Sequence, residues 1–161
     1  MTSYESDIRA LLDSRAEASR AKDIDRLMSL YADDIVYYDA VPPLRFIGHE
    51  AVRANFLRWF GAYDGPIGLE THELTVASTD ADLAFAHMLH LDSGKRTNGL
   101  DTAMWVRSSV CFRRSGGGWL ITHEHISLPI DPETLHVWFP SDDFVPSRPR
   151  SQELGGGSGP R

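Results

Sequence analysis

The stretch "YADDIVYYDAVPPLRFIGHEAVRANF" (residues 31–56) decides the fold of this chain. Its β-forming run over 35–38 predicts a strand, "DIVYYDAV", that ends at the Pro42-Pro43 pair. The piece "FIG" is short and extended, and a helix is predicted after it over about residues 49–62. The stretch therefore contains a strand, a proline break and a helix in close succession.

Helices are predicted before this stretch and strands after it. Residues 4–22 place Ile8, Leu11 and Leu12 at helical spacing, and "AKDIDRLMSLYADD" predicts a shorter helix capped by Asp23. Four strands follow, "LETHELTVAS", "LAFAHMLHLD", "LDTAMWVRSSVCFRR" and "WLITHEHISLP", separated by turn signals. This order predicts an α+β fold, a cone-shaped roll of N-terminal helices packed in a strongly curved antiparallel or mixed sheet. An apolar interior open at one end is a usual place for a small-molecule site.

Length and composition indicate one domain. The chain has 161 residues and 42% hydrophobic content, enough for one core, which we place in residues 1–140. Residues 141–161 are polar and rich in Gly, Ser and Pro, and they predict a disordered tail. Between the two, Leu135, Trp138 and Phe139 are expected to pack back on the body or on a partner subunit.

Charge and cysteine content exclude several classes of protein. A formal net charge of −7 argues against a nucleic-acid or anionic-membrane partner, because no basic field would hold phosphates. No apolar run is long enough for a membrane span. The single Cys111 forms no intramolecular disulfide, so a cytoplasmic location is the expectation, with Cys111 as a buried, inert thiol.

The last strand carries a pair of histidines two residues apart. Strict alternation places His123, His125 and Ser127 on one face, together with Trp119 and Ile121. The pair has three interpretations: metal ligands, neutral histidines that line a polar pocket, or acid–base groups. A catalytic zinc site usually needs three protein ligands, and His87, His72 or Asp39 could supply the third; the polar-pocket and acid–base interpretations are preferred, and no metal is predicted. Glu124 falls on the opposite face, where a cross-strand salt bridge is its expected role.

Two stretches resemble a known superfamily. Residues 31–56 resemble the helix end, first strand and third-helix start of a ketosteroid isomerase. The segment "WVRSSVCFRRSGGGWLITHEHISLP" resembles the last two strands of SnoaL-like and calcium/calmodulin kinase association-type domains. Over about residues 5–130 the chain is thus identified as a member of the nuclear transport factor 2-like superfamily, in the SnoaL-like or ketosteroid-isomerase-like group. Such proteins share a cavity and not a reaction, and they often form homodimers through the sheet, so a homodimer is expected.

The resemblance implies a role for Asp39. It matches the general base of the isomerase, whereas the residues alone also allow a turn aspartate that bonds backbone N–H groups. The isomerase's oxyanion donors do not carry over, because Arg15 stands where its Tyr would be. Ser109 or Val110 stands where its Asp would be, depending on the turn.

The remaining candidates come from strand parity. Arg107 shares a face with Trp105 and Ser109, where it would balance Asp39 or a substrate oxyanion unless it is an exposed sheet arginine. His87 rather than His90 is expected to face inward. The predicted catalytic residues are Asp39, His123, His125 and Arg107, and the predicted substrate-binding residues are Tyr37, Phe56, Trp59, His87, Trp105, Ser109 and Ser127.

The function expected from these residues and from the resemblance is enzymatic. It is cofactor-independent acid–base chemistry in an apolar cavity, of the isomerase, cyclase or dehydratase type, on a carbonyl-bearing substrate. One alternative is a non-catalytic ligand-binding or association module, favoured if Phe56, Trp59 and Trp105 fill the cavity. A second is hydration like that of iota-type carbonic anhydrases, whose His-His-His-Ser-Ser run is broken here by Glu124 and Ile126.

Overall fold

The computed structural model describes residues 2–78, 81–140, 144 and 146, and it contains the predicted helices and strands in the predicted order. The predicted tail over 141–161 lies outside the described residues except for Phe144 and Pro146. The elements are α1 (Ser3–Ala21), α2 (Ile24–Met28), β1 (Tyr31–Tyr38), β2 (Phe46–Ile47), α3 (His49–Gly61), β3 (Gly68–Ser78), β4 (Leu83–Lys95), β5 (Asp101–Ser115) and β6 (Gly118–Ser127).

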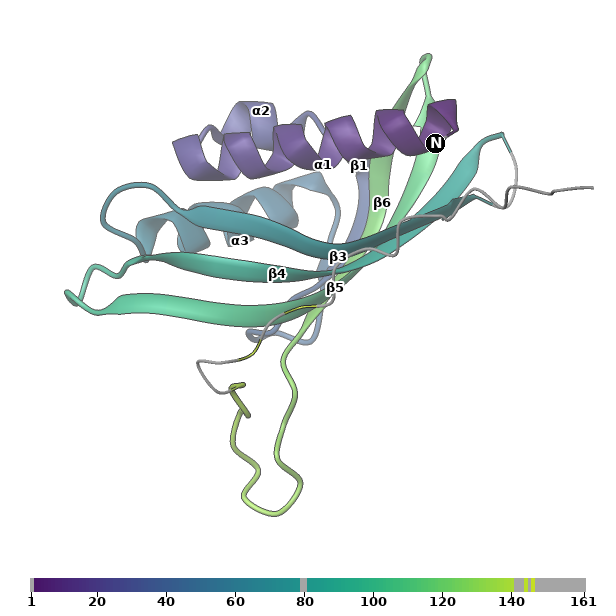
Figure 1. The fold of residues 1–161 in the computed structure, drawn as a ribbon. Coiled ribbons are helices and arrows are strands. Elements are labelled where there is room, and N and C mark those ends of the chain that lie inside the picture. Colours follow the sequence, from purple (N-terminus) through teal and green to yellow (C-terminus); the bar gives the residue numbers. More distant parts are fainter. Residues whose placement is uncertain (1, 79–80, 141–143, 145, 147–161) are drawn as a thin grey trace, which may run out of the picture.

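The strands form one mixed sheet with the order β2-β1-β6-β5-β4-β3. β1 pairs with β6 in parallel, and the other neighbours are antiparallel. The sheet curves, and α1, α2 and α3 lie on one side of it, as Figure 1 shows. The predicted α+β class and the cone-like shape are confirmed. No helix in the described part of the chain is both long and apolar enough to cross a membrane.

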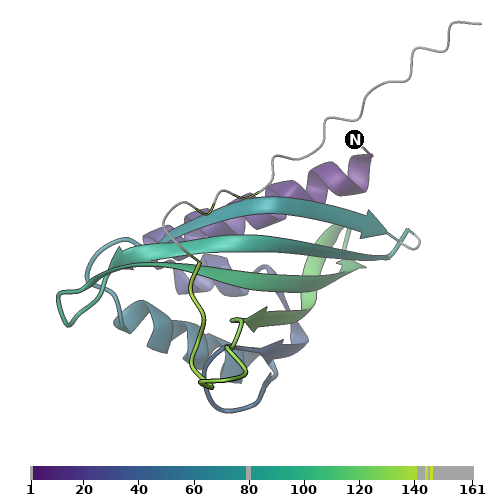
Figure 2. The same cartoon turned by 60° about the horizontal axis from the view of Figure 1, so that its bottom comes forward.

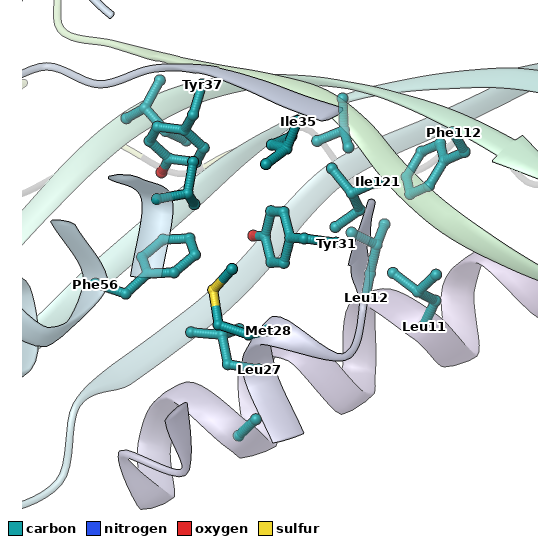
Figure 3. Packing of buried hydrophobic residues seen from close by; sticks show 14 of the residues in the cluster. Leu11, Leu12, Leu27, Met28, Tyr31, Ile35, Tyr37, Phe56, Phe112 and Ile121 are labelled. Carbon is teal, nitrogen blue, oxygen red and sulfur yellow. The ribbon is translucent and has the colours of Figure 1, made fainter. Parts of the chain in front are cut away.

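The core lies between the helices and the inner face of the sheet. The predicted stripe of α1 is fully or almost fully buried at Ile8 and Leu12, and the helix packs on β3 and β6. Figure 3 shows Tyr31, Ile35 and Phe56 in this layer, where the rings of Tyr31 and Phe56 lie 5.3 Å apart. Each large apolar side chain buried here stabilises the fold by roughly 1.5–3 kcal/mol.

A β-bulge in β6 changes which residues face the core. Phe112 of β5 pairs with Ile121, and the next residue back, Cys111, pairs with His123, so Thr122 is one extra residue on β6. Before Thr122 the inward residues are Trp119 and Ile121, as predicted. After it the inward residues are Glu124 and Ile126. The predicted common face of residues 119 to 127 is therefore wrong beyond the bulge, and Glu124 is fully buried instead of forming a surface salt bridge.

The parity predicted for β4 and β5 is also wrong. On β4, Ala86, Met88 and His90 are buried, whereas His87 is exposed. The prediction took the face of Phe85 and Leu89 as the inner one, but the inner face of β4 carries Ala84, Ala86, Met88 and His90. On β5 the inner residues are Val106, Ser108, Val110 and Phe112, so Arg107, Ser109 and Cys111 lie on the outer face. Cys111 is thus exposed and not buried, although partial burial raises the pKa of its thiol.

Residues 130–139 do not pack on the body, whereas the ring of Phe144, further along the chain, lies 5.2 Å from that of Trp105 on β5. An isolated bridge between Ile130 and Val137 closes a short arm that projects away from the sheet in Figures 1 and 2. Leu135 and Trp138 are 77% and 52% exposed, so the expectation that this segment packs back on its own domain is wrong. Its packing on a partner subunit, and the homodimer itself, stay predictions.

Candidate functional site

A cavity of about 60 Å³ lies inside the cone. On the scale of roughly 15 Å³ per enclosed water, it holds a few waters or a molecule of a few non-hydrogen atoms. Its wall has an aromatic part, a polar part and an aliphatic part, the last formed by Leu27, Leu69, Val106 and Ile126. The aromatic part consists of Tyr37, Phe56 and Trp59, and the titratable part of Arg15, Asp39, His90 and Asp92.

A buried ion pair supports the polar wall. Arg15 Nη2 of α1 donates to Glu124 Oε1 of β6 at 2.5 Å, and Tyr31 Oη donates to Glu124 Oε2 at 2.8 Å. Arg15 is 5% exposed and Glu124 is fully buried. Two charges this deep are tolerated because each neutralises the other and both carboxylate oxygens are hydrogen-bonded.

For both Arg15 and Glu124, burial shifts the pKa in one direction and the ion pair shifts it in the other. Burial raises the pKa of Glu124, and Arg15 and the Tyr31 hydroxyl offset part of the rise. Burial alone would lower the pKa of Arg15, but Glu124 and the nearby tyrosines raise it by more. Burial also holds the pKa of Tyr31 well above its ordinary value. Arg15 therefore stays a cation and Tyr31 a neutral donor.

His90 is a neutral part of the wall. Arg15 Nη1 donates to its Nε2 at 3.3 Å, which places the ring proton on Nδ1, where it is donated to Thr71 Oγ1 at 3.3 Å. Burial, with a further contribution from the Arg15 charge, lowers the pKa of His90 to about 3. At neutral pH His90 is a fixed dipole and not a proton carrier.

Asp39 lies at the end of β1 and lines the cavity. Its Oδ2 accepts from Asn55 Nδ2 at 2.7 Å, and its Oδ1 accepts from the amide of Ala40 at 2.6 Å. Arg58 Nη2 lies 3.9 Å from Oδ2 and also donates to Asn55 Oδ1 at 2.6 Å. Asp39 therefore makes the backbone contact of a turn aspartate and also occupies the cavity position expected of a base.

Asp92 is the functional candidate that sequence reasoning missed. It lies on β4 opposite Leu69, lines the cavity, and has a buried Oδ1 with no hydrogen-bond partner among the described residues. Burial raises its pKa from 3.8 to about 7; Arg15 opposes the rise, while Asp39 and Glu124 add to it. An unpaired buried carboxyl oxygen is unfavourable for folding, and a carboxyl that titrates near neutrality is typical of functional sites.

The structure divides the predicted site residues between the cavity wall and positions outside the cavity. Asp39, Tyr37, Phe56 and Trp59 line the cavity. The others lie outside it, because of the bulge in β6 and the reversed parity of β4 and β5; they are the predicted catalytic residues His123, His125 and Arg107 and the predicted binding residues His87, Trp105, Ser109 and Ser127.

Outside the cavity these residues make local contacts. The Tyr38 ring lies 5.0 Å from that of His123 and 5.6 Å from that of His125. The Arg107 Nε donates to Ser127 Oγ at 3.1 Å. The His-rich pattern that resembles iota-type carbonic anhydrases therefore has no counterpart inside the cavity. Within the described ranges, no three His, Cys, Asp or Glu side chains are arranged to hold a metal ion.

One signal for the missed polar wall was present in the sequence. Arg15 follows Ile8, Leu11 and Leu12 at helical spacing, and a charge on the buried face of α1 requires a buried partner. Asp92 and His90 lie two residues apart on β4 and so on the same face of the strand. Both line the cavity because that face is turned inward.

Comparison with known proteins agrees with this architecture. The SnoaL-like domain profile matches residues 8–131. An NTF2-like protein of unknown function from Pseudomonas putida KT2440 is 37% identical, with a TM-score of 0.79 over 91% of this chain and 99% of that one. No curated protein matches the chain.

More distant structures show the fold alone. A ketosteroid isomerase-like protein from Erwinia carotovora atroseptica SCRI1043 is 21% identical, with a TM-score of 0.68 over 79% of this chain and 97% of that one. A protein of unknown function with a cystatin-like fold from Nostoc punctiforme PCC 73102 is 15% identical, with a TM-score of 0.67 over 82% and 95%. The profile match and the Pseudomonas relative establish that this chain belongs to the SnoaL-like family of the nuclear transport factor 2-like superfamily.

Proposed function

We propose that this protein is a cofactor-independent enzyme that moves a proton on a small carbonyl-bearing substrate. The observation that carries the proposal is Asp92, whose buried, unpaired oxygen and pKa of about 7 occur in the same cavity as Asp39. A carboxyl with a pKa near the working pH is populated in both protonation states and can serve as acid or base. The isomerase-like description of a structural neighbour supports the same class of reaction.

The two aspartates would have different roles. Asp39 accepts hydrogen bonds at both oxygens and would act as the carboxylate base that removes a proton from the carbon beside the carbonyl. The electron pair of that C–H bond becomes the C=C bond of an enol, and the carbonyl oxygen takes the proton of Asp92. Asp39 then returns its proton to carbon while the enol O–H proton goes back to Asp92 as the C=O bond re-forms, which restores both aspartates; in a β,γ-unsaturated substrate the enol is a dienol, and protonation at the γ-carbon completes an isomerisation.

Oxyanion donors like those of the isomerase are absent at Arg15 and at Ser109 or Val110. Two other groups in the cavity would donate hydrogen bonds to the substrate oxygen in their place. Protonated Asp92 is one, and Tyr37 is another, because burial holds the pKa of its hydroxyl well above the ordinary value. Donors arranged toward the oxygen on which charge develops are often the largest contribution to such catalysis. Asn55 would be a positioning residue that orients Asp39.

The proposal predicts enzyme-dependent deuterium exchange. With acetone in D₂O at pD 7, the protein is expected to accelerate exchange of the methyl protons above the buffer rate, followed by loss of the proton NMR signal. Asp39→Asn removes the base while keeping its shape, and it should slow the catalysed exchange by about 10²-fold or more. Asp92→Asn should also slow it, since its amide cannot transfer a proton to the oxygen.

Asp101→Asn is the matched control for both variants. It makes the same change of charge at an exposed position on β5, and it should leave exchange unchanged. Exchange at the wild-type rate in Asp39→Asn would refute the role of Asp39. Exchange at the buffer rate in the wild-type protein, with a small ligand still bound, would favour the second candidate, a binding module; the modest cavity volume is the observation in favour of that candidate.

A further inference from the structure

We infer that the cavity selects a small ammonium cation over neutral and anionic molecules of the same size. The inference concerns binding, so it goes beyond the proposed reaction and holds whether or not the site catalyses. It rests on three features of the wall: an unpaired acceptor, an excess of carboxylates and an aromatic surface.

The unpaired acceptor is Oδ1 of Asp92. It is buried, belongs to a residue of the cavity wall, and receives no hydrogen bond from the described residues. Its neighbours on the wall do not provide one, because the His90 Nδ1 proton goes to Thr71 and the Arg15 guanidinium is directed to Glu124 and His90. A ligand that brings an N–H to this oxygen removes the penalty of the unmade bond.

The charges around the cavity favour a cation. At pH 8, above its pKa of about 7, Asp92 is largely ionised, and the buried cation that acts on it, Arg15, is already paired with Glu124 at 2.5 Å. His90 is uncharged, so Asp39 and Asp92 have no buried cation of their own among the described residues. Arg58 lies 3.9 Å from Asp39, but its side chain is 53% exposed and solvent screens its charge. An anion would find no free positive group among these residues, and a neutral molecule would leave the negative excess uncompensated.

The aromatic wall adds to the same preference. Tyr37 and Phe56 lie 5.4 Å apart between ring centroids, and Trp59 lies 6.4 Å from Phe56. Aromatic rings beside a carboxylate form the usual recognition surface for ammonium groups, through their negative faces. The volume of about 60 Å³ limits the ligand to a short alkyl group beside the nitrogen.

The test compares three probes with the same number of non-hydrogen atoms: isopropylammonium, propan-2-ol and acetate. The full chain, labelled with ¹⁵N, is titrated with each at pH 8 in phosphate buffer, and Kd is taken from amide shifts of cavity residues. Isopropylammonium is expected to bind at least about tenfold more tightly than the other two.

Matched pairs of variants test whether residues of the cavity wall cause the preference for the cation. Asp92→Asn should reduce isopropylammonium binding to the level of propan-2-ol, whereas the charge-matched Asp101→Asn should not. Trp59→Leu should weaken it about threefold to tenfold, whereas Trp138→Leu on the projecting arm should not. Equal affinity for propan-2-ol or acetate, no cavity shifts with the cation, or equal losses in Asp92→Asn and Asp101→Asn would overturn the inference.

This result is separable from the proposed function. A cation preference without acetone exchange would contradict the reaction and leave the inference standing. Acetone exchange without a cation preference would support the reaction and overturn the inference.

Discussion

Glu124→Gln is expected to lower the free energy of unfolding by about 3 to 5 kcal/mol at pH 7. The substitution keeps the shape of the side chain but leaves the Arg15 cation buried beside a neutral amide. Arginine cannot lose its proton to escape this environment, so the desolvation penalty stays in full. Urea unfolding followed by circular dichroism measures the loss.

The two halves of this ion pair are expected to behave differently. Arg15→Met leaves Glu124 without its cation, but burial already raises the pKa of Glu124, so it can take up a proton and become neutral. Arg15→Met should therefore destabilise less than Glu124→Gln at pH 6, by a margin that shrinks as pH rises. The double variant Arg15→Met, Glu124→Leu should be more stable than Glu124→Gln, because it buries no charge.

A surface ion pair is the matched control. Arg26 and Glu17 lie 2.7 Å apart with half-exposed side chains, so Glu17→Gln should change stability by less than about 1 kcal/mol. If Glu124→Gln costs no more than Glu17→Gln, the buried pair does not have the structural role assigned to it here.

Asp92→Asn is expected to stabilise the protein, by up to about 4 kcal/mol at pH 8. In the folded state the pKa of Asp92 is raised from 3.8 to about 7, mainly by burial. Between these two pH values the folded state binds more protons than the unfolded state, so the contribution of Asp92 to stability falls as pH rises. Asparagine does not titrate and avoids this loss.

The pH profile distinguishes this cause from a simple packing effect. The advantage of Asp92→Asn should be near zero at pH 4, grow up to about pH 7 and stay constant above it, in urea unfolding at pH 4, 6 and 8. An advantage independent of pH, or a less stable variant at pH 8, would contradict the assignment. Higher stability together with slower exchange is the behaviour expected where function requires an unfavourable buried group.

The aromatic and polar walls of the cavity differ in how far sequence could predict them. Tyr37, Phe56 and Trp59 follow from local patterns, since strand and helix periodicity already place them on inward faces. Asp39 follows from the resemblance over residues 31–56. Asp92 and Glu124 depend on which face of β4 and β6 is turned inward, and on these strands the predicted alternation indicated the wrong face.

The sequence by itself determined the helices, the strands, their order and the family, because these depend on local periodicity, turn residues and the order of motifs within short stretches. Only the tertiary structure decided the site. The register in which β5 and β6 pair leaves Thr122 as a bulge. The bulge turns Glu124 inward, where it meets Arg15, 109 residues away along the chain. The pKa of Asp92 likewise depends on burial and on charges from separate elements, which meet only when the cone closes around them.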